Sequence, residues 1–381
     1  MASTPVVHSS ADFREAFVRR GGSSAAKCYQ CATCSSVCEL APANAPFPRR
    51  QVLMAQWGLE DQIVADPGPW LCPQCNDCSV RCPREVNPGD VMAVVRAMTG
   101  ESLSVPRIMG RLTANITASW PALVFVPLLF WIVLLGVTTG LAIPEVNGSL
   151  PALEGRFHYE EFVPHVLIYA VYTTVTILVL AAMWLSGRKF WKLIGSGTER
   201  SGSLIGTLPG VFIDIATHKK FSSCDNGVPK RRWGHFLVMW GFVGAAVTSG
   251  ILVIYMYGLH TYPLPLDHWV KWLGNFSAIA LVVGGLLLYV NRLNTGDTLV
   301  GNTTPSDRFF LYVVIGVILT GVLTEVFRFV AIPPVVACAI YVLHLSIVLT
   351  LFVSVPYSKF AHILYRTLAM AHERMTTSEE Q

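Results

Sequence analysis

Charged residues are scarce in this sequence, because only 14% of its 381 residues are Asp, Glu, Lys or Arg. About a quarter of the residues are charged in ordinary soluble proteins, and here the hydrophobic share is correspondingly high at 52%. These two features exclude an ordinary soluble protein. The net charge of +4 is small and no basic patch is interleaved with aromatic residues, so nucleic-acid binding has little support.

The first twenty residues lack the uninterrupted apolar core of a secretory signal peptide. We expect instead a short amphipathic helix after Ser10 that ends at Gly21 and Gly22, with Phe13, Phe17 and Val18 on one side. Without a secretory signal, the cysteines are expected in a reducing compartment, where disulfides do not persist. The charged residues that interrupt the apolar core are Asp12, Arg14, Glu15, Arg19 and Arg20.

Eight of the ten cysteines occur in two copies of the spacing C-x2-C-x2-C-x3-C. Thiolates three residues apart on a tight loop can bind three irons of one [4Fe-4S] cluster, and in two-cluster ferredoxins the fourth cysteine of each run ligates the other cluster. The spacing therefore predicts two [4Fe-4S] clusters that exchange their fourth cysteine. We expect one cluster on Cys28, Cys31, Cys34 and Cys82, and the other on Cys72, Cys75, Cys78 and Cys38.

Two zinc sites are the main alternative, since eight cysteines are enough for two tetrahedral thiolate sites. Zinc sites usually consist of two separated cysteine pairs, however, and do not need a third cysteine at the same spacing. The iron-sulfur interpretation is therefore favoured over zinc, and disulfides are the least favoured of the three.

The chain divides by composition into two parts, residues 1–111 and residues 112–381. The first part carries the eight clustered cysteines and has helical rather than strand patterns around them, so it is expected to be an α-helical two-cluster ferredoxin domain. Pro48 opens one predicted helix, which breaks at Gly58 and resumes to Val64, and a further helix runs from about Gly89 to Met98.

The second part contains six apolar stretches of about 20 residues, which is the length needed to cross a bilayer. The expected fold class is therefore all-α, with the ferredoxin domain followed by a six-helix transmembrane bundle. The predicted spans are about 120–142, 162–185, 233–257, 268–290, 308–330 and 335–357.

The distribution of basic residues predicts the orientation of the bundle. The loop over 186–232 is rich in Lys and Arg, whereas the loop over 144–161 contains Glu145, Glu154, Glu160 and Glu161. By the positive-inside rule the basic loop faces the cytoplasm. The chain is thus expected to be a multi-pass protein of the cytoplasmic (inner) membrane, with both termini and the iron-sulfur domain on the cytoplasmic side.

Histidines inside apolar helices need a partner, and haem iron is one such partner. His344 lies within the sixth span and His362 follows it by eighteen residues, or about 27 Å along a straight helix. His235 opens the third span at the same membrane edge as His362, so these two are the expected axial pair of one haem b. The best partner for His344 is His165, although it lies roughly 12 Å further out by helical rise.

Two other assignments are open at the outer side of the bundle. His165 is equally well explained as an interfacial residue that is hydrogen-bonded to Glu161 or to lipid headgroups. Glu325 is a candidate proton acceptor for a quinol beside the outer haem, but a local ion pair with Arg328 is favoured over that role, and Lys271 lies at a similar depth.

Two segments resemble known families. The cysteine runs, Lys27 to Cys38 and Trp70 to Arg84, resemble the iron-sulfur C-subunit of heterodisulfide reductase over about the first 100 residues. The stretch from His344 to His362 looks like the last span of the gamma subunit of respiratory nitrate reductase, a dihaem cytochrome b. That family carries a second histidine ten residues after the position of His235, where this sequence has Ala245.

The fusion of these two parts resembles the C-subunit of the quinone-interacting membrane-bound oxidoreductase complex of sulfur-metabolising prokaryotes. This resemblance implies two haems b, whereas the histidines alone leave the number at one or two. It also implies menaquinone as the membrane substrate, and two flavoprotein subunits related to the A-subunit of heterodisulfide reductase. It also implies adenylylsulfate reductase as the eventual electron exchanger, in dissimilatory sulfur metabolism.

The expected function is therefore that of an electron-transfer subunit of an oxidoreductase complex, which carries electrons between menaquinol and soluble partners through haem b and two [4Fe-4S] clusters. A membrane-anchored ferredoxin without haem is the first alternative. A redox-linked transporter and a zinc-stabilised adaptor are weaker ones, since charged residues are scarce at the bilayer midplane.

Overall fold

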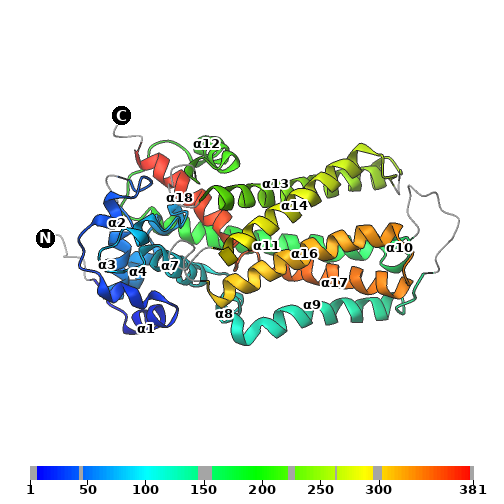
Figure 1. The fold of residues 1–381 in the computed structure, drawn as a ribbon, viewed down its shortest axis with the longest axis horizontal. Helices are drawn as coiled ribbons and strands as arrows, with labels where there is room; N and C mark the ends of the chain where they lie inside the picture. Colours follow the sequence, from blue (N-terminus) through cyan, green and yellow to red (C-terminus); the bar gives the residue numbers. More distant parts are fainter. Residues whose placement is uncertain are drawn as a thin grey trace.

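The structure is a computed structural model that describes residues 7–42, 46–144, 157–221, 228–261, 264–294 and 303–377. Within these ranges the chain forms helices and no strands, which confirms the all-α prediction. Short helices gather at one end, and long helices extend side by side from them (Figure 1). We call the end of the bundle that adjoins the short helices the near end, and the opposite end the far end. The predicted acidic residues Glu145 and Glu154 lie outside the described residues.

The N-terminal helices largely follow the sequence prediction, except that Val18 is exposed while Phe13 and Phe17 are buried. The Ser10 hydroxyl accepts a hydrogen bond from the Phe13 amide and thereby caps α1. The break at Gly58 is a left-handed residue, φ 68°, at the end of α3, where a residue without Cβ is least strained. The predicted Gly89–Met98 helix is longer and runs over Pro88–Leu103 as α7. The helices of this part are α1 (Ala11–Arg19), η1 (Gly22–Lys27), α2 (Thr33–Ser36), α3 (Arg49–Trp57), α4 (Glu60–Val64), α5 (Gly68–Leu71), α6 (Asp77–Val80) and α7, followed by α8 (Arg107–Ala114).

Among the described residues, six helices are long and apolar enough to cross a membrane, which confirms the predicted spans. They alternate in direction, so the last helix, α18 (Ala361–Thr377), lies at the near end together with α1 (Figure 1). The six are α9 (Ile116–Thr138), α11 (His165–Ile194), α13 (Val228–Val253) with its π-helical continuation η3 (Ile254–Gly258), α14 (Trp269–Asn294), α16 (Pro305–Phe329) and α17 (Pro334–Ser354). The connections contain α10 (Tyr159–Phe162), α12 (Leu204–Thr217) and η2 (Lys219–Phe221).

The sixth span ends earlier than the sequence suggests. Helix α17 stops at Ser354, and His362 lies in the separate helix α18. Pro356 falls in the turn between them, where it has no amide hydrogen to continue a helical ladder. The estimate of about 27 Å between His344 and His362 assumed one straight helix, so it does not apply to the observed fold.

Helices α13 and α14 approach each other through small residues. A Cβ on Gly284 would lie 2.8 Å from the carbonyl oxygen of Gly234, and a Cβ on Gly241 would lie 2.7 Å from a side-chain carbon of Leu281. Backbones come this close in membrane bundles only where side chains are absent or small. The contact fixes the first turns of α13, which include His235.

The ferredoxin domain packs directly against the near end of the bundle. Trp70 and Cys72 share a buried core with Phe190 of α11 and Tyr365 of α18. The Trp70 and Tyr365 rings are 4.6 Å apart, and the Phe190 and Tyr365 rings 5.3 Å apart. Burial of aromatic rings of this size is strongly stabilising, so the two parts of the chain form one continuous structure at this junction.

Candidate functional site

The eight cysteines line two separate cavities in the ferredoxin domain. Cys28, Cys31, Cys34 and Cys82 line the distal cavity. Cys38, Cys72, Cys75 and Cys78 line the proximal cavity, so named because it lies next to the bundle. These are the two sets that follow from exchange of the fourth cysteine, although the ligand assignment itself stays a prediction.

The cysteines of each set surround a space rather than converge on one point. Among the described residues, no group of three or more His, Cys, Asp or Glu is placed to hold a single metal ion. A tetrahedral zinc ion requires all four sulfurs at one bond length from one centre. A cubane binds each thiolate at a different iron corner, so four cysteines that line a cavity are compatible with it.

The two cysteine loops have the same backbone conformation. Gln30 and Gln74 have φ of 59° and 58°, and Ala32 and Asn76 have φ of 69° and 68°. Left-handed residues other than glycine are uncommon, and here they occur at equivalent places in both loops. This turn directs the backbone N–H of Gln30 to the Cys28 sulfur, 3.4 Å away, and the backbone N–H of Gln74 to the Cys72 sulfur, 3.3 Å away. Amide donors aimed at sulfur stabilise the charge of a bound cluster.

Burial differs among the thiols. Burial raises the pKa of Cys34 and Cys78, and it raises the pKa of Cys38 to about 11. These buried thiols must therefore lose protons when they bind metal. Cys31 is exposed, and a hydrogen bond from the Thr33 side chain lowers the pKa of its thiol.

The surroundings of the two cavities are opposite. The distal cavity opens beside exposed residues, since Cys31 is exposed and Tyr29 is 71% exposed with the Arg84 guanidinium 4.0 Å above its ring. The proximal cavity adjoins the junction core through Cys72. One cavity thus faces away from the bundle and the other faces it.

Arginines join the proximal cysteine loop to the bundle. Arg96 of α7 donates to the Cys72 carbonyl oxygen at 2.8 Å. Arg231 in the first turn of α13 donates to the carbonyl oxygens of Pro73 at 3.0 Å and Gln74 at 2.6 Å. His235 follows Arg231 by four residues and therefore lies on the same face of α13. One helical turn thus connects the cysteine loop to the predicted inner haem ligand.

The structure brings His235 and His362 together at the near end. Their ring centres are 6.2 Å apart. An iron bonded to one nitrogen of each ring at about 2 Å would place the ring centres roughly 6 Å apart, so the pair fits an axial site. Nδ1 of His362 is hydrogen-bonded to the Lys359 carbonyl oxygen, which leaves Nε2 for a metal, as in most ligating histidines. Burial lowers the pKa of His362 to about 4, so its ring is neutral at pH 7.

His218 is a third imidazole at this place, and the sequence analysis missed it. Its Nε2 lies 2.7 Å from Nδ1 of His235, and the side chain is only 4% exposed. Burial also lowers the pKa of His218. The residue has a left-handed backbone, φ 52°, at the end of α12, which folds it back under α13. It lies in the basic loop outside the predicted spans, directly after α12, and the sequence analysis did not single it out.

His344 has a different environment in the middle of α17. Its Nδ1 lies 2.9 Å from the Thr320 hydroxyl of α16, and a Cβ on Gly321 would meet its Cε1 at 3.0 Å. Nε2 therefore remains the nitrogen for any metal. Tyr172 of α11 donates to the Leu345 carbonyl oxygen at 2.6 Å and so marks the depth of His344.

His165 is the first residue of α11, seven residues before Tyr172, and stacks on Tyr169 with ring centres 6.3 Å apart. It lies about 10 Å further toward the far end than His344 by helical rise. The structure thus keeps the depth difference noted from the sequence, and pairing of His165 with His344 stays a prediction.

Glu325 forms an ion pair with Lys271 of α14, whose Nζ lies 3.2 Å from the carboxylate. Glu325 thus has an ion pair with Lys271, and Arg328 lies buried near the Phe329 ring. A role of Glu325 in accepting a quinol proton stays a prediction.

Comparison with known proteins assigns both parts of the chain. The sequence profile of the family described as Citrate utilization protein B matches residues 119–381, which is more than half of the chain. The chain belongs to this family. The profile described as 4Fe-4S dicluster domain matches residues 24–86, which include both cysteine runs.

Individual relatives agree with this division. Citrate utilization protein B of Escherichia coli is 26% identical over 363 residues, which cover 90% of this chain and 88% of that protein. The C-subunit of the H(2):CoB-CoM heterodisulfide,ferredoxin reductase of Methanothermobacter thermautotrophicus is 38% identical over 86 residues, or 22% of this chain and 46% of that protein. No solved structure matches the chain. Residues 24–86 thus form an iron-sulfur domain related to the heterodisulfide reductase C-subunit, on a membrane part of the citrate utilization protein B type.

Proposed function

We propose that this chain is the membrane electron-transfer subunit of a quinone-interacting oxidoreductase, which connects menaquinol in the bilayer with soluble flavin or iron-sulfur partner subunits. The observation that carries the proposal is the His235 and His362 pair, with ring centres 6.2 Å apart and adjacent to the proximal cysteine loop through Arg231. When bound, haem b and two [4Fe-4S] clusters would supply one-electron carriers.

The order of the sites supports a path for electrons through the molecule. The imidazole pair lies at the near end of the bundle, the proximal cysteines adjoin it through Arg231, and the distal cysteines lie on the side with exposed Cys31 and Tyr29. We infer that the distal set exchanges electrons with the soluble partner. The chain's residues hold the carriers in sequence, and the potentials of donor and acceptor decide the direction of flow.

The near end is proposed to face the cytoplasm. It carries the basic loop residues Arg188, Lys189 and Lys192 at the end of α11, whereas Glu160 and Glu161 lie at the far end. Positive residues favour the cytoplasmic side of a bundle. This orientation places the iron-sulfur domain where soluble partners are available.

Two identities for the partner are in competition. Resemblance to the quinone-interacting complex favours two flavoproteins related to the heterodisulfide reductase A-subunit, with adenylylsulfate reductase as electron exchanger. The relative that matches 90% of the chain is named for citrate utilization, which favours a partner enzyme that acts on a small carboxylic acid. The two identities can be distinguished by adding purified adenylylsulfate reductase to the reduced protein. Reoxidation of the clusters would support the first identity, and clusters that stay reduced would support the second.

The test of the proposed function is an optical and EPR redox titration of the purified full-length protein, followed by the His362→Ala variant. The wild type is expected to show a b-type haem spectrum and signals of two [4Fe-4S] clusters, and the variant to lose the inner haem while it keeps both clusters. His8→Ala, at an exposed position ahead of α1, is the matched control. Protein with clusters but without any haem would favour the membrane-anchored ferredoxin instead.

A further inference from the structure

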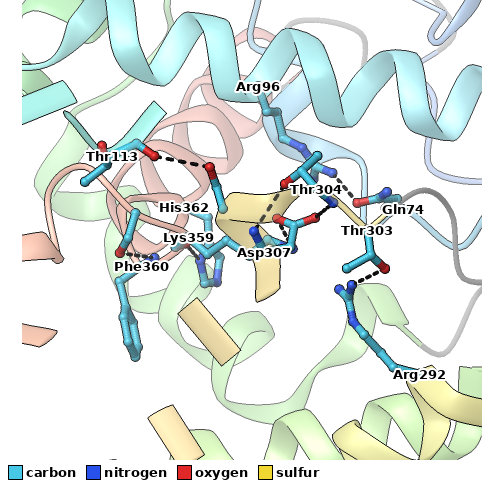
Figure 2. Close-up of polar contacts among 12 residues, drawn as sticks. Gln74, Arg96, Thr113, Arg292, Thr303, Thr304, Asp307, Lys359, Phe360 and His362 are labelled. Atoms are coloured by element: carbon cyan, nitrogen blue, oxygen red, sulfur yellow. Dashed lines mark hydrogen bonds and ion pairs between the residues drawn. The ribbon is translucent and has the colours of Figure 1, made fainter. Parts of the chain in front are cut away.

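Basic side chains are concentrated between the proximal cysteine loop and the imidazole pair. The group comes from four parts of the chain that meet only at the near end, and each member lies within electrostatic range of at least one other. Figure 2 shows the part of this group around His362. We call it the basic junction, and its residues are Arg96, Arg231, Arg292, Lys359 and Arg366.

Hydrogen bonds from three of these arginines reach neutral oxygens. Arg96 donates to the Cys72 carbonyl and, at 2.9 Å, to the Gln74 side chain, and Arg231 donates to two further carbonyls of that loop. Arg292 donates to the Thr303 hydroxyl at 2.7 Å. Neutral acceptors orient a guanidinium but do not compensate its charge.

Two carboxylates lie near the group, Asp307 beside Lys359 and Glu373 within electrostatic range of Arg366. Lys359 forms an ion pair with Asp307 at 2.8 Å, and Asp307 is held in place by the capping box with Thr304 at the start of α16 (Figure 2). The basic junction therefore has more positive than negative charge. Burial and repulsion from Arg96 lower the pKa of Arg366 to about 10, which indicates that like charges crowd together here.

Like charges gathered among partly buried side chains repel one another unless anions lie among them. The imidazole pair provides the position of such anions, because His362 feels the charges of Arg366, Arg96 and Lys359, and His235 those of Arg231 and Arg366. A porphyrin ligated by both imidazoles would carry two carboxylates at its rim. Guanidinium groups bind carboxylates in a fixed, two-pronged geometry.

We propose that the basic junction binds the two propionate carboxylates of the porphyrin held between His235 and His362. This inference rests on the haem part of the proposed function. It assigns to Arg96, Arg231 and Arg366, whose charges act on the two imidazoles, a direct role in positioning the porphyrin and in stabilising its reduced state, since positive charge favours the form with one more electron.

The competing anion is the proximal iron-sulfur cluster, whose cysteines Cys72 and Cys75 also lie within range of Arg231. The two anions are separable, because haem and cluster have different spectra. Loss of a charge that serves the porphyrin changes the haem titration, whereas loss of a charge that serves the cluster changes the EPR titration.

The experiment is a redox titration of Arg231→Gln and Arg366→Gln in full-length protein, followed at the haem absorbance and at the cluster EPR signals. We expect each variant to favour oxidised haem by about tenfold at a fixed ambient potential, which corresponds to about 59 mV for one electron. Arg231→Lys is expected to retain most of the wild-type potential, because it keeps the charge. Arg188→Gln, which replaces an exposed arginine at the near end of α11, is the matched control and is expected to leave the titration unchanged.

A second measurement does not depend on variant folding. Haem-depleted wild type is reconstituted with iron protoporphyrin IX and, separately, with its dimethyl ester, which has no free carboxylates. Weaker retention of the ester supports the proposal. Equal retention of both porphyrins, or variants that shift only the cluster signals, would overturn it while the proposed function stands. Wild-type protein without any b-type haem would overturn both.

Discussion

The distal and proximal cysteine loops are alike in backbone and opposite in surroundings. Both have left-handed residues at the same two positions, and in both the backbone N–H of a glutamine donates to the first cysteine sulfur of the run. The distal loop has Tyr29 and Cys31 exposed, whereas the proximal loop is hydrogen-bonded to Arg96 and Arg231 and packed into the junction core. A repeated sequence spacing thus fixes the local shape, and the neighbours brought by the fold decide what each copy adjoins.

The largest expected effect comes from removing one cysteine of each set. Cys75→Ser is expected to remove the proximal cluster and to prevent menaquinol from reducing the distal one, because the path is interrupted between the bundle and the distal set. Cys31→Ser is expected to leave the proximal cluster reducible by menaquinol. EPR spectra after addition of menaquinol measure both results. Equal loss of signal in the two variants would contradict the proposed order.

The next effect concerns the contact that makes one loop proximal. Tyr365 is fully buried against Trp70 and Phe190, so Tyr365→Ala is expected to cost about 3–5 kcal/mol by creating a cavity at the junction. Thermal unfolding measured with cluster absorbance should show an earlier loss of the ferredoxin domain. Tyr365→Phe keeps the ring and is the control, with an expected change below about 1.5 kcal/mol.

A smaller effect is expected from a change at His218. Its Nε2 lies 2.7 Å from Nδ1 of His235, whereas Nδ1 of His362 is hydrogen-bonded to the Lys359 carbonyl oxygen. Partners of this kind orient a ligating ring, and their loss typically weakens metal binding about 10–100-fold. His218→Ala should therefore weaken haem retention and shift the haem spectrum, and His218→Asn should restore part of it through a side-chain amide. A spectrum that is unchanged in both variants would remove His218 from the site.

Much of the fold followed from the sequence, for identifiable reasons. Apolar stretches of about 20 residues can only be buried in lipid or protein, so the spans were predictable within a few residues. The Ser10 cap and the Gly58 break were predictable from local chemistry. The predicted sixth span, about 335–357, continues past the observed end of α17 at Ser354. The prediction ran too far because the apolar pattern continues through the turn that contains Pro356.

The candidate site was predictable only where spacing carries the information. The two cysteine sets could be predicted because their spacing belongs to short loops. The pair of His235 and His362 could be predicted because both residues lie at the same membrane edge. His218 and Arg231 reach the site through long-range packing of α12 and α13, which no local pattern encodes. For His344, depth along the helix suggested His165 as a partner. It could not show that the Thr320 hydroxyl of the neighbouring helix α16 contacts its Nδ1.

The most direct test of the account is the order in which the clusters are reduced after wild-type protein is mixed with menaquinol, followed by freeze-quench EPR. The account predicts that haem b is reduced first, the cluster on Cys72, Cys75, Cys78 and Cys38 next, and the cluster on Cys28, Cys31, Cys34 and Cys82 last, with neither cluster reduced in His362→Ala. Reduction of the distal cluster before the proximal one, or full cluster reduction in His362→Ala, would contradict it.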